Sequence, residues 1–151
     1  GDVYKRQGYL KEARDAGELD WRAIGGTWGI ATSRLKDWER DQTSYCPDNL
    51  TPIIEGISRA NSKSGPLLAK YVDKYFEDMW LHFKSVRKIM KQGAEVHYIV
   101  GNSKFYDNLI PVETFYADML EKAGFEKTKI EVIRKRNSKR ELFEFDVMAI
   151  A

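Results

Sequence analysis

One segment determines the predicted fold: Glu95-Val96-His97-Tyr98-Ile99-Val100-Gly101-Asn102-Ser103. Val96 to Val100 form a short run of β-branched and aromatic residues, and Gly101 ends it. Val96, Tyr98 and Val100 fall on one face of the run, and Ile99 beside His97 falls on the other. A strand with two apolar faces is typical of the middle of a parallel sheet, where helices cover both sides. We therefore expect a buried parallel strand here.

The residues that follow this strand are the first candidate site. In open α/β sheets, ligands bind beyond the carboxyl ends of the strands. Gly101, Asn102 and Ser103 stand at that end, and the Asn102 amide could both donate to and accept from a ligand. In the alternative interpretation, Gly101 and Asn102 form a tight turn in which the Asn102 side chain bonds its own backbone.

The flanking segments predict an ordered series of helices and strands. A long helix is expected over residues 66–92, because apolar residues recur there in steps of three and four. Pro111 opens a second helix that runs to about Ala123. Residues 128–135 and 142–150 alternate as strands, and the short turn between them allows only an antiparallel pair. The fold class is therefore α/β, ordered as helix, buried strand, helix and closing antiparallel hairpin.

An irregular helical region is expected before this part. Residues 8–18 have the pattern of a helix end, and a further helix starts near Thr51 and Pro52 and breaks at residues 61–65. Between them, residues 23–29 contain three glycines within five positions, with Trp28 just before the last of them. This loop could meet a substrate, with Trp28 as a stacking residue, or it could be an irregular connection with Trp28 in the core.

Composition limits the classes of protein that fit. The chain has 151 residues, enough for one modest domain, and its net charge of +2 is too small to indicate nucleic acid by itself. Cys46 is the only cysteine, which excludes an internal disulfide and fits a cytoplasmic protein. No apolar run approaches the roughly 18 residues of a membrane span. His82, His97 and Cys46 lie on different elements, so no metal site is expected.

Two charged or unusual segments have alternative interpretations. Residues 1–7 look like the translated read-through of a sequencing adapter, or else a natural N-terminus. If they are a scar, the natural protein continues upstream. Residues 127–140 are rich in lysine and arginine and could meet phosphates, or could be a solvated hairpin with basic ends.

The sequence resembles a group of bacterial site-specific DNA methyltransferases that modify adenine N6 or cytosine N4. Residues 16–29 are similar to the segment after that family's catalytic tetrapeptide. Residues 71–80 and 97–105 are similar to its long helix and to a strand ending in Gly-Asn-Ser, and residues 111–125 resemble its next helix. The resemblance implies the last third of a Rossmann-like class I methyltransferase fold, whose mostly parallel sheet closes with a last strand inserted antiparallel beside the fifth.

The resemblance has one departure, which bears on activity. That family holds S-adenosylmethionine in a glycine-rich turn after the first strand and the target amine at a Pro-Pro-aromatic motif. Neither a Pro-Pro nor a strand-linked glycine motif of that kind occurs in this chain. We therefore expect both the cofactor site and the catalytic residues to lie upstream of this chain. Residues 1–7 would be the scar, residues 8–65 would follow the missing catalytic motif, and residues 66–151 would be the C-terminal part of the methyltransferase domain.

The resemblance also implies partners and a site. Such enzymes flip the target base out of the DNA stack. Gly101, Asn102 and Ser103 would border the base pocket, and DNA would be the partner, with a restriction endonuclease possible as a second. The DNA contacts expected are Gly26, Thr27, Trp28, Lys104, Arg134 and Arg136. Two alternatives are a non-catalytic nucleic-acid-binding module and a methyltransferase of the same fold acting on RNA, protein or a small molecule.

Overall fold

The computed structural model describes residues 13–26, 33–136 and 141–151, and it divides the chain into two compact units. The first unit is Gly1–Glu39 and the second is Arg40–Ala151. In the first unit, helix α2 (Ala13–Arg22) carries Glu18, which accepts a hydrogen bond of 2.9 Å from Arg34. Leu35 is fully buried within the same unit. The strands and the predicted Gly101–Ser103 site belong to the second unit.

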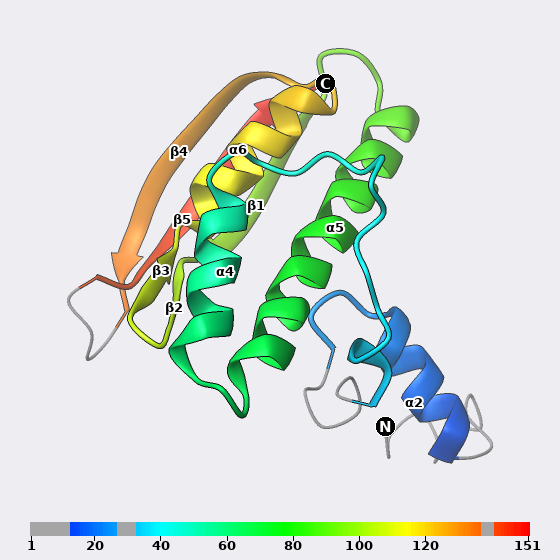
Figure 1. The fold of residues 1–151 in the computed structure, drawn as a ribbon. Coiled ribbons are helices and arrows are strands. Elements are labelled where there is room, and N and C mark those ends of the chain that lie inside the picture. The colour runs from blue at the N-terminus through cyan, green and yellow to red at the C-terminus, as the bar shows by residue number, and fades with distance from the viewer. Residues whose placement is uncertain (1–12, 27–32, 137–140) are drawn as a thin grey trace. The chain divides into compact units, whose positions relative to one another are not determined.

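Two antiparallel helices begin the regular structure of the second unit (Figure 1). These are α4 (Leu50–Ala60) and α5 (Gly65–Ile89), which confirms the long helix expected from the spacing of apolar residues. They approach closely where α5 begins, because a Cβ on Gly65 would lie 2.5 Å from the main-chain oxygen of Ser58. Only glycine fits at that point without a shift of backbone. Helix α5 ends at an extended residue, Met90, and Gly93 then turns the chain with φ of +84°.

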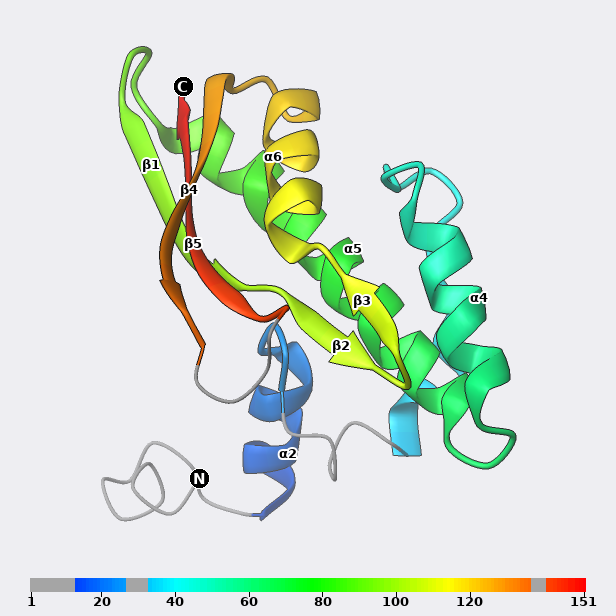
Figure 2. The ribbon, with the colours of Figure 1, turned by 90° about the vertical axis from the view of Figure 1, so that its left-hand side faces the viewer.

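The main sheet has three antiparallel strands (Figure 2). They are β1 (Glu95–Gly101), β4 (Glu126–Lys135) and β5 (Phe143–Ile150), in the order β1-β5-β4. The last strand therefore lies between the other two. Tyr98 pairs with Val147, and Val147 pairs with Ile130. The closing hairpin and the antiparallel pairing of the last strand beside β1 are both confirmed.

The position expected for β1 inside a parallel sheet is not found. Among the described strands it pairs only with β5, so it is an edge strand, and no parallel pair is present in the described sheet. Helices α5 and α6 (Val112–Lys122) lie on the same side of the sheet (Figure 2). Ile99, on the other face, is 61% exposed. The expectation of helices on both faces is thus wrong for the described residues.

The reason for the exposed face is visible in its side chains. His97 lies between two carboxylates, with Nδ1 at 2.9 Å from Asp146 and Nε2 at 2.5 Å from Glu95. These are polar groups that an exposed sheet face satisfies without a covering helix. Strand alternation places Glu95 on the face of His97, but the approach of Asp146 depends on the register of β5, which the sequence pattern could not show.

The hydrophobic core lies between the other face of the sheet and the two helices. Phe83 and Tyr116 are buried members of this core, and Val96, Tyr98 and Val100 of β1 pack against it. The aromatic rings meet edge to face, with 5.0 Å between the centroids of Phe83 and Tyr98. The buried hydroxyls are paired as well: Tyr98 with His82, and Tyr75 with Tyr116. The aromatic stripe of α5 is thus core, as expected.

A small hairpin between β1 and α6 was not predicted. It consists of β2 (Ser103–Phe105) and β3 (Asn108–Ile110). Its two tip residues, Tyr106 and Asp107, both have positive φ, 46° and 64°. Two-residue hairpin turns of this kind usually contain glycine or asparagine. The absence of glycine at the tip removed the usual sequence signal.

Candidate functional site

The structure brings most of the predicted site residues to one corner of the second unit. Gly101 ends β1, Asn102 follows it, and Ser103 and Lys104 begin β2. The pairing places Gly101 opposite Glu144 of β5, and Glu144 opposite Arg134 of β4. Arg136 follows directly after β4. Residues separated by more than 30 positions are thus neighbours.

The remaining predicted residues belong to the first unit or are not described. Gly26 belongs to the first unit, where the space a Cβ would need is taken by the main-chain oxygen of Asp20. Thr27 and Trp28 lie outside the described residues, as do Lys139 and Arg140 of the basic segment. The two interpretations of Trp28 both remain predictions.

Asn102 holds the corner together. It is only 4% exposed, and its Nδ2 donates to the main-chain oxygen of Glu141 at 2.8 Å. Its Oδ1 accepts from the main-chain N–H of Phe143 at 2.9 Å. The amide therefore bonds backbone about 40 positions away, rather than its own backbone as one of the two interpretations expected. It joins the end of β1 to the beginning of β5, an arrangement that we call the Asn102 bridge.

Gly101 makes space for the guanidinium of Arg136. A Cβ on Gly101 would lie 2.8 Å from Arg136 Nη1 and 3.4 Å from the main-chain oxygen of Phe143. Arg136 Nη1 donates to the main-chain oxygen of Asn102 at 3.2 Å. The side chain of Arg136 thus extends from the end of β4 to the end of β1. A larger residue at Gly101 would displace it.

Arg134 is held by a carboxylate on the neighbouring strand. Its Nε and Nη2 donate to the two oxygens of Glu144 at 2.6 and 3.1 Å. This bidentate hydrogen bonding raises the pKa of Arg134 and lowers the pKa of Glu144. Arg134, Lys135, Arg136 and Glu144 line a surface depression of about 270 Å³. The depression is therefore lined by three cationic residues and one carboxylate.

Lys104 lies on the hairpin side of the same corner. Its Nζ donates to Glu141 at 2.7 Å and lies 3.8 Å from Asp107. The hydrogen bond with Glu141 is the main cause of the raised pKa of Lys104. Because two carboxylates already neutralise it, Lys104 has less charge to offer a phosphate than Arg136 has.

Three residues of this corner were missed as site residues: Lys135, Glu141 and Glu144. Lys135 was visible only as one of several cations in the basic segment. The alternation of residues 142–150 does put Glu144 on the polar face, but its pairing with Arg134 depends on a register shift in β4 between Val132 and Arg134. That shift has no clear sequence signal.

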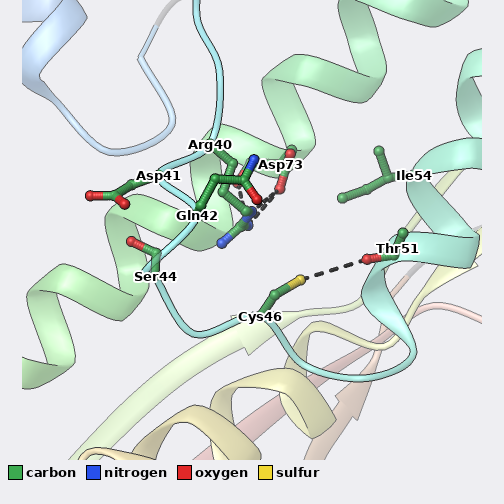
Figure 3. A pocket seen from close by; sticks show the side chains of 8 residues that line it. All are labelled: Arg40, Asp41, Gln42, Ser44, Cys46, Thr51, Ile54 and Asp73. Carbon is green, nitrogen blue, oxygen red and sulfur yellow. Dashed lines mark hydrogen bonds and ion pairs between the residues drawn. The ribbon is translucent and has the colours of Figure 1, made fainter.

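A second depression, of about 230 Å³, lies beside the start of the second unit (Figure 3). Arg40 Nε donates to Asp73 at 2.7 Å, and Cys46 Sγ lies 3.8 Å from Thr51 Oγ1. Tyr45, next to Cys46, donates to Asp118 at 2.8 Å. The Arg40–Asp73 ion pair and the Tyr45–Asp118 hydrogen bond fasten residues 40–46 to α5 and α6. This arrangement is structural.

Neither depression matches a large cofactor site. Both are smaller than the roughly 300–1,000 Å³ of ordinary small-molecule pockets, and charged and hydroxyl side chains form much of their walls. Within residues 13–26, 33–136 and 141–151, no cluster of three histidine, cysteine or acidic residues could hold a metal ion. In the same ranges, every helix is too short or too polar to cross a membrane.

Comparison of the chain with family models, curated proteins and solved structures finds no match in any of the three.

Proposed function

We propose that this chain is the C-terminal part of an S-adenosylmethionine-dependent DNA methyltransferase that modifies an exocyclic amino group of adenine or cytosine. One observation carries the proposal: the last strand, β5, is inserted antiparallel between β1 and β4, after a helix, strand and helix. This is the closing arrangement that the sequence resemblance implies. The parallel part of such a sheet would lie beside the free edge of β1. An enzyme of this kind would be cytoplasmic.

The corner would then border the base pocket. Gly101 and Ser103 would contribute main chain to its wall, and Asn102 would position that main chain through its bridge to residues 141 and 143. Lys104, Arg134 and Arg136 would face the DNA backbone, with Gly26, Thr27 and Trp28 as the predicted contacts of the first unit. Phosphate contacts of this kind fix a protein on DNA without reading its sequence.

S-adenosylmethionine does not fit the described residues. The two depressions are small and have charged walls, so neither suits an adenine ring and a methionine moiety together. The cofactor and the catalytic residues are expected in a part of the natural protein upstream of this chain.

A second candidate is a nucleic-acid-binding module without catalytic activity. The depression lined by Arg134, Lys135 and Arg136 favours it, because such a cluster can bind phosphates whether or not an active site exists. This candidate requires no upstream catalytic motif.

The discriminating experiment is a methyl-transfer assay with labelled S-adenosylmethionine and duplex DNA of mixed sequence. It would compare residues 1–151 with a protein extended by the upstream genomic reading frame. We expect no transfer by residues 1–151 and transfer by the extended protein. Activity of residues 1–151 alone would show that the catalytic motifs are not missing. An upstream frame without a glycine-rich turn and a Pro-Pro-aromatic motif would refute the methyltransferase proposal and leave the binding module.

A further inference from the structure

We propose that Arg134, Lys135 and Arg136 form a binding site for a single phosphate group at the end of the exposed sheet face. The site is the depression of about 270 Å³ that these residues line together with Glu144. Identification of the ligand as a phosphodiester of DNA rests on the proposed function. The existence of the phosphate site does not, because it follows from the arrangement of the cations.

Both arginines are held in place before a ligand arrives. Glu144 fixes Arg134 through two hydrogen bonds, and the main-chain oxygen of Asn102 fixes Arg136 through one. The Asn102 bridge in turn holds that oxygen at the junction of β1 and β5. A guanidinium that is already ordered loses less side-chain entropy when it binds an anion. The missing side chain at Gly101 is what allows Arg136 to reach this position.

The charge balance of the depression favours an anion. It contains three cations and one carboxylate, and that carboxylate is engaged with Arg134. Lys135 has no ion pair within the described part of the chain. Arg136 uses Nη1 for its hydrogen bond to Asn102, so Nη2 and Nε can serve a ligand. The net charge left for a ligand is therefore positive.

The chemistry of these donors suits phosphate better than a base or a cofactor. Guanidinium groups offer paired N–H donors that match phosphate oxygens, and two guanidinium groups can share the oxygens of one phosphate. Among the described residues that line the depression, none has an aromatic ring on which a base could stack. Its volume is below that of ordinary cofactor pockets.

Three variants of the full 151-residue chain test the site. Arg136→Ala removes one cation, and Arg136→Lys keeps the charge but removes the paired donors. Gly101→Ala changes no charge and instead places a Cβ within 2.8 Å of the resting position of Arg136 Nη1. The matched control is Arg59→Ala, which removes an exposed arginine paired only loosely with Glu55 on helix α4. Thermal melting verifies that each variant is folded before binding is measured.

Two probes separate the possible sources of the phosphate. Inorganic phosphate is titrated by calorimetry, and a short fluorescent duplex is titrated by anisotropy over a series of salt concentrations. We expect Arg136→Ala and Gly101→Ala to weaken binding of both probes by about tenfold, as for the loss of one charge-assisted hydrogen bond. The slope of log affinity against log salt for the duplex should fall by about 0.9 in Arg136→Ala. Arg136→Lys should be intermediate, and Arg59→Ala should match the original chain.

The outcomes distinguish the site from the proposed function. Binding of inorganic phosphate that depends on Arg136 and Gly101, without duplex binding, would support the phosphate site and count against DNA as its source. A duplex in which methylphosphonates replace the phosphates should lose the dependence on Arg136. If neither probe binds, or if Arg136→Ala and Gly101→Ala behave like Arg59→Ala with both probes, the phosphate site is refuted.

Discussion

Asn102 shows how one buried polar residue can connect two strands that are distant in sequence. Its side chain satisfies a main-chain donor and a main-chain acceptor at the start of β5, where water cannot replace it. Removing the amide would leave the N–H of Phe143 and the oxygen of Glu141 without these partners. Their loss is expected to weaken the junction of β1 and β5 and to release the main-chain oxygen that holds Arg136.

We predict that Asn102→Ala lowers the free energy of unfolding by about 2–3 kcal/mol, since two buried hydrogen bonds are lost and their main-chain partners stay buried. Urea denaturation monitored by circular dichroism would measure this change. Asn49→Ala is the matched control, because Asn49 is exposed and its side chain makes no cap hydrogen bond. Its effect should stay within about 0.5 kcal/mol. Equal stability of Asn102→Ala and the original chain would mean that the bridge contributes nothing.

His97 gives the exposed sheet face a dependence on pH. Hydrogen bonds with Asp146, which has the larger effect, and with Glu95 raise the pKa of His97 above its usual value of 6.5. A raised pKa in the folded state means that the charged form is favoured by folding. The stability that His97 contributes is therefore fully present below about pH 6.5 and is lost as pH rises through the raised pKa.

The corresponding prediction concerns His97→Gln, which removes the titrating group. The difference in free energy of unfolding between the original chain and this variant should be largest at about pH 5 to 6, the lower end of the pH range in which histidine titrates. It should decrease toward about pH 9. Urea denaturation at a series of pH values measures it. His82→Gln is the control, because His82 bonds Tyr98 and not a carboxylate. A difference that grows with pH would contradict the assigned sign.

At the scale of elements, the two edges of the main sheet differ. The β4 edge carries lysines and arginines and has two register shifts, which are features that discourage pairing with another strand. The β1 edge has seven residues with continuous register, without lysine or proline. Every other residue of an antiparallel edge strand points its main-chain N–H and C=O away from its partner. The β1 edge is therefore open to pairing.

We predict that the 151-residue chain associates as its concentration rises and that Ile99→Lys reduces this association. Lysine on an edge strand opposes pairing because its charge would be brought against another strand. Sedimentation velocity at increasing protein concentration would measure the effect. Ile89→Lys makes the same chemical change at an 83% exposed position at the end of α5 and should leave association unchanged. A chain that stays monomeric throughout would contradict the open edge.

The sequence predicted elements better than their environment. Local patterns were strong enough for the long helix, the β1 strand, the closing hairpin and the next helix, whose predicted limits lie within about three residues of those observed. Burial of β1 on both faces was wrong because Ile99 was taken as a buried residue, whereas it is exposed beside an ion-paired His97. The partners of Asn102 and Arg136 could not be predicted, because they depend on strand register between segments more than 30 positions apart.

At the scale of the whole molecule, the main hydrophobic core lies entirely within the second unit. Its buried members extend from Leu50 to Ala151 and come from α4, α5, α6 and the strands. Residues 40–49 add polar connections to this core. Arg40 pairs with Asp73, and Tyr45 both donates to Asp118 and packs its ring against Trp80. The unit should therefore be able to fold without residues 1–39, but less well without residues 40–49.

The last prediction tests this division with two truncations. Residues 40–151 should melt in a single cooperative transition, because they retain the whole core cluster and its polar connections. Residues 50–151 lose the Arg40–Asp73 ion pair, which is largely shielded from solvent, and the contacts of Tyr45 with Asp118 and Trp80. Their melting temperature should be lower by about 5 °C or more. Both transitions are measured by circular dichroism at about 222 nm, in the helix band, because helices supply much of the fold. If residues 40–151 do not fold, or if both truncations melt alike, the boundary at Arg40 is not a folding boundary.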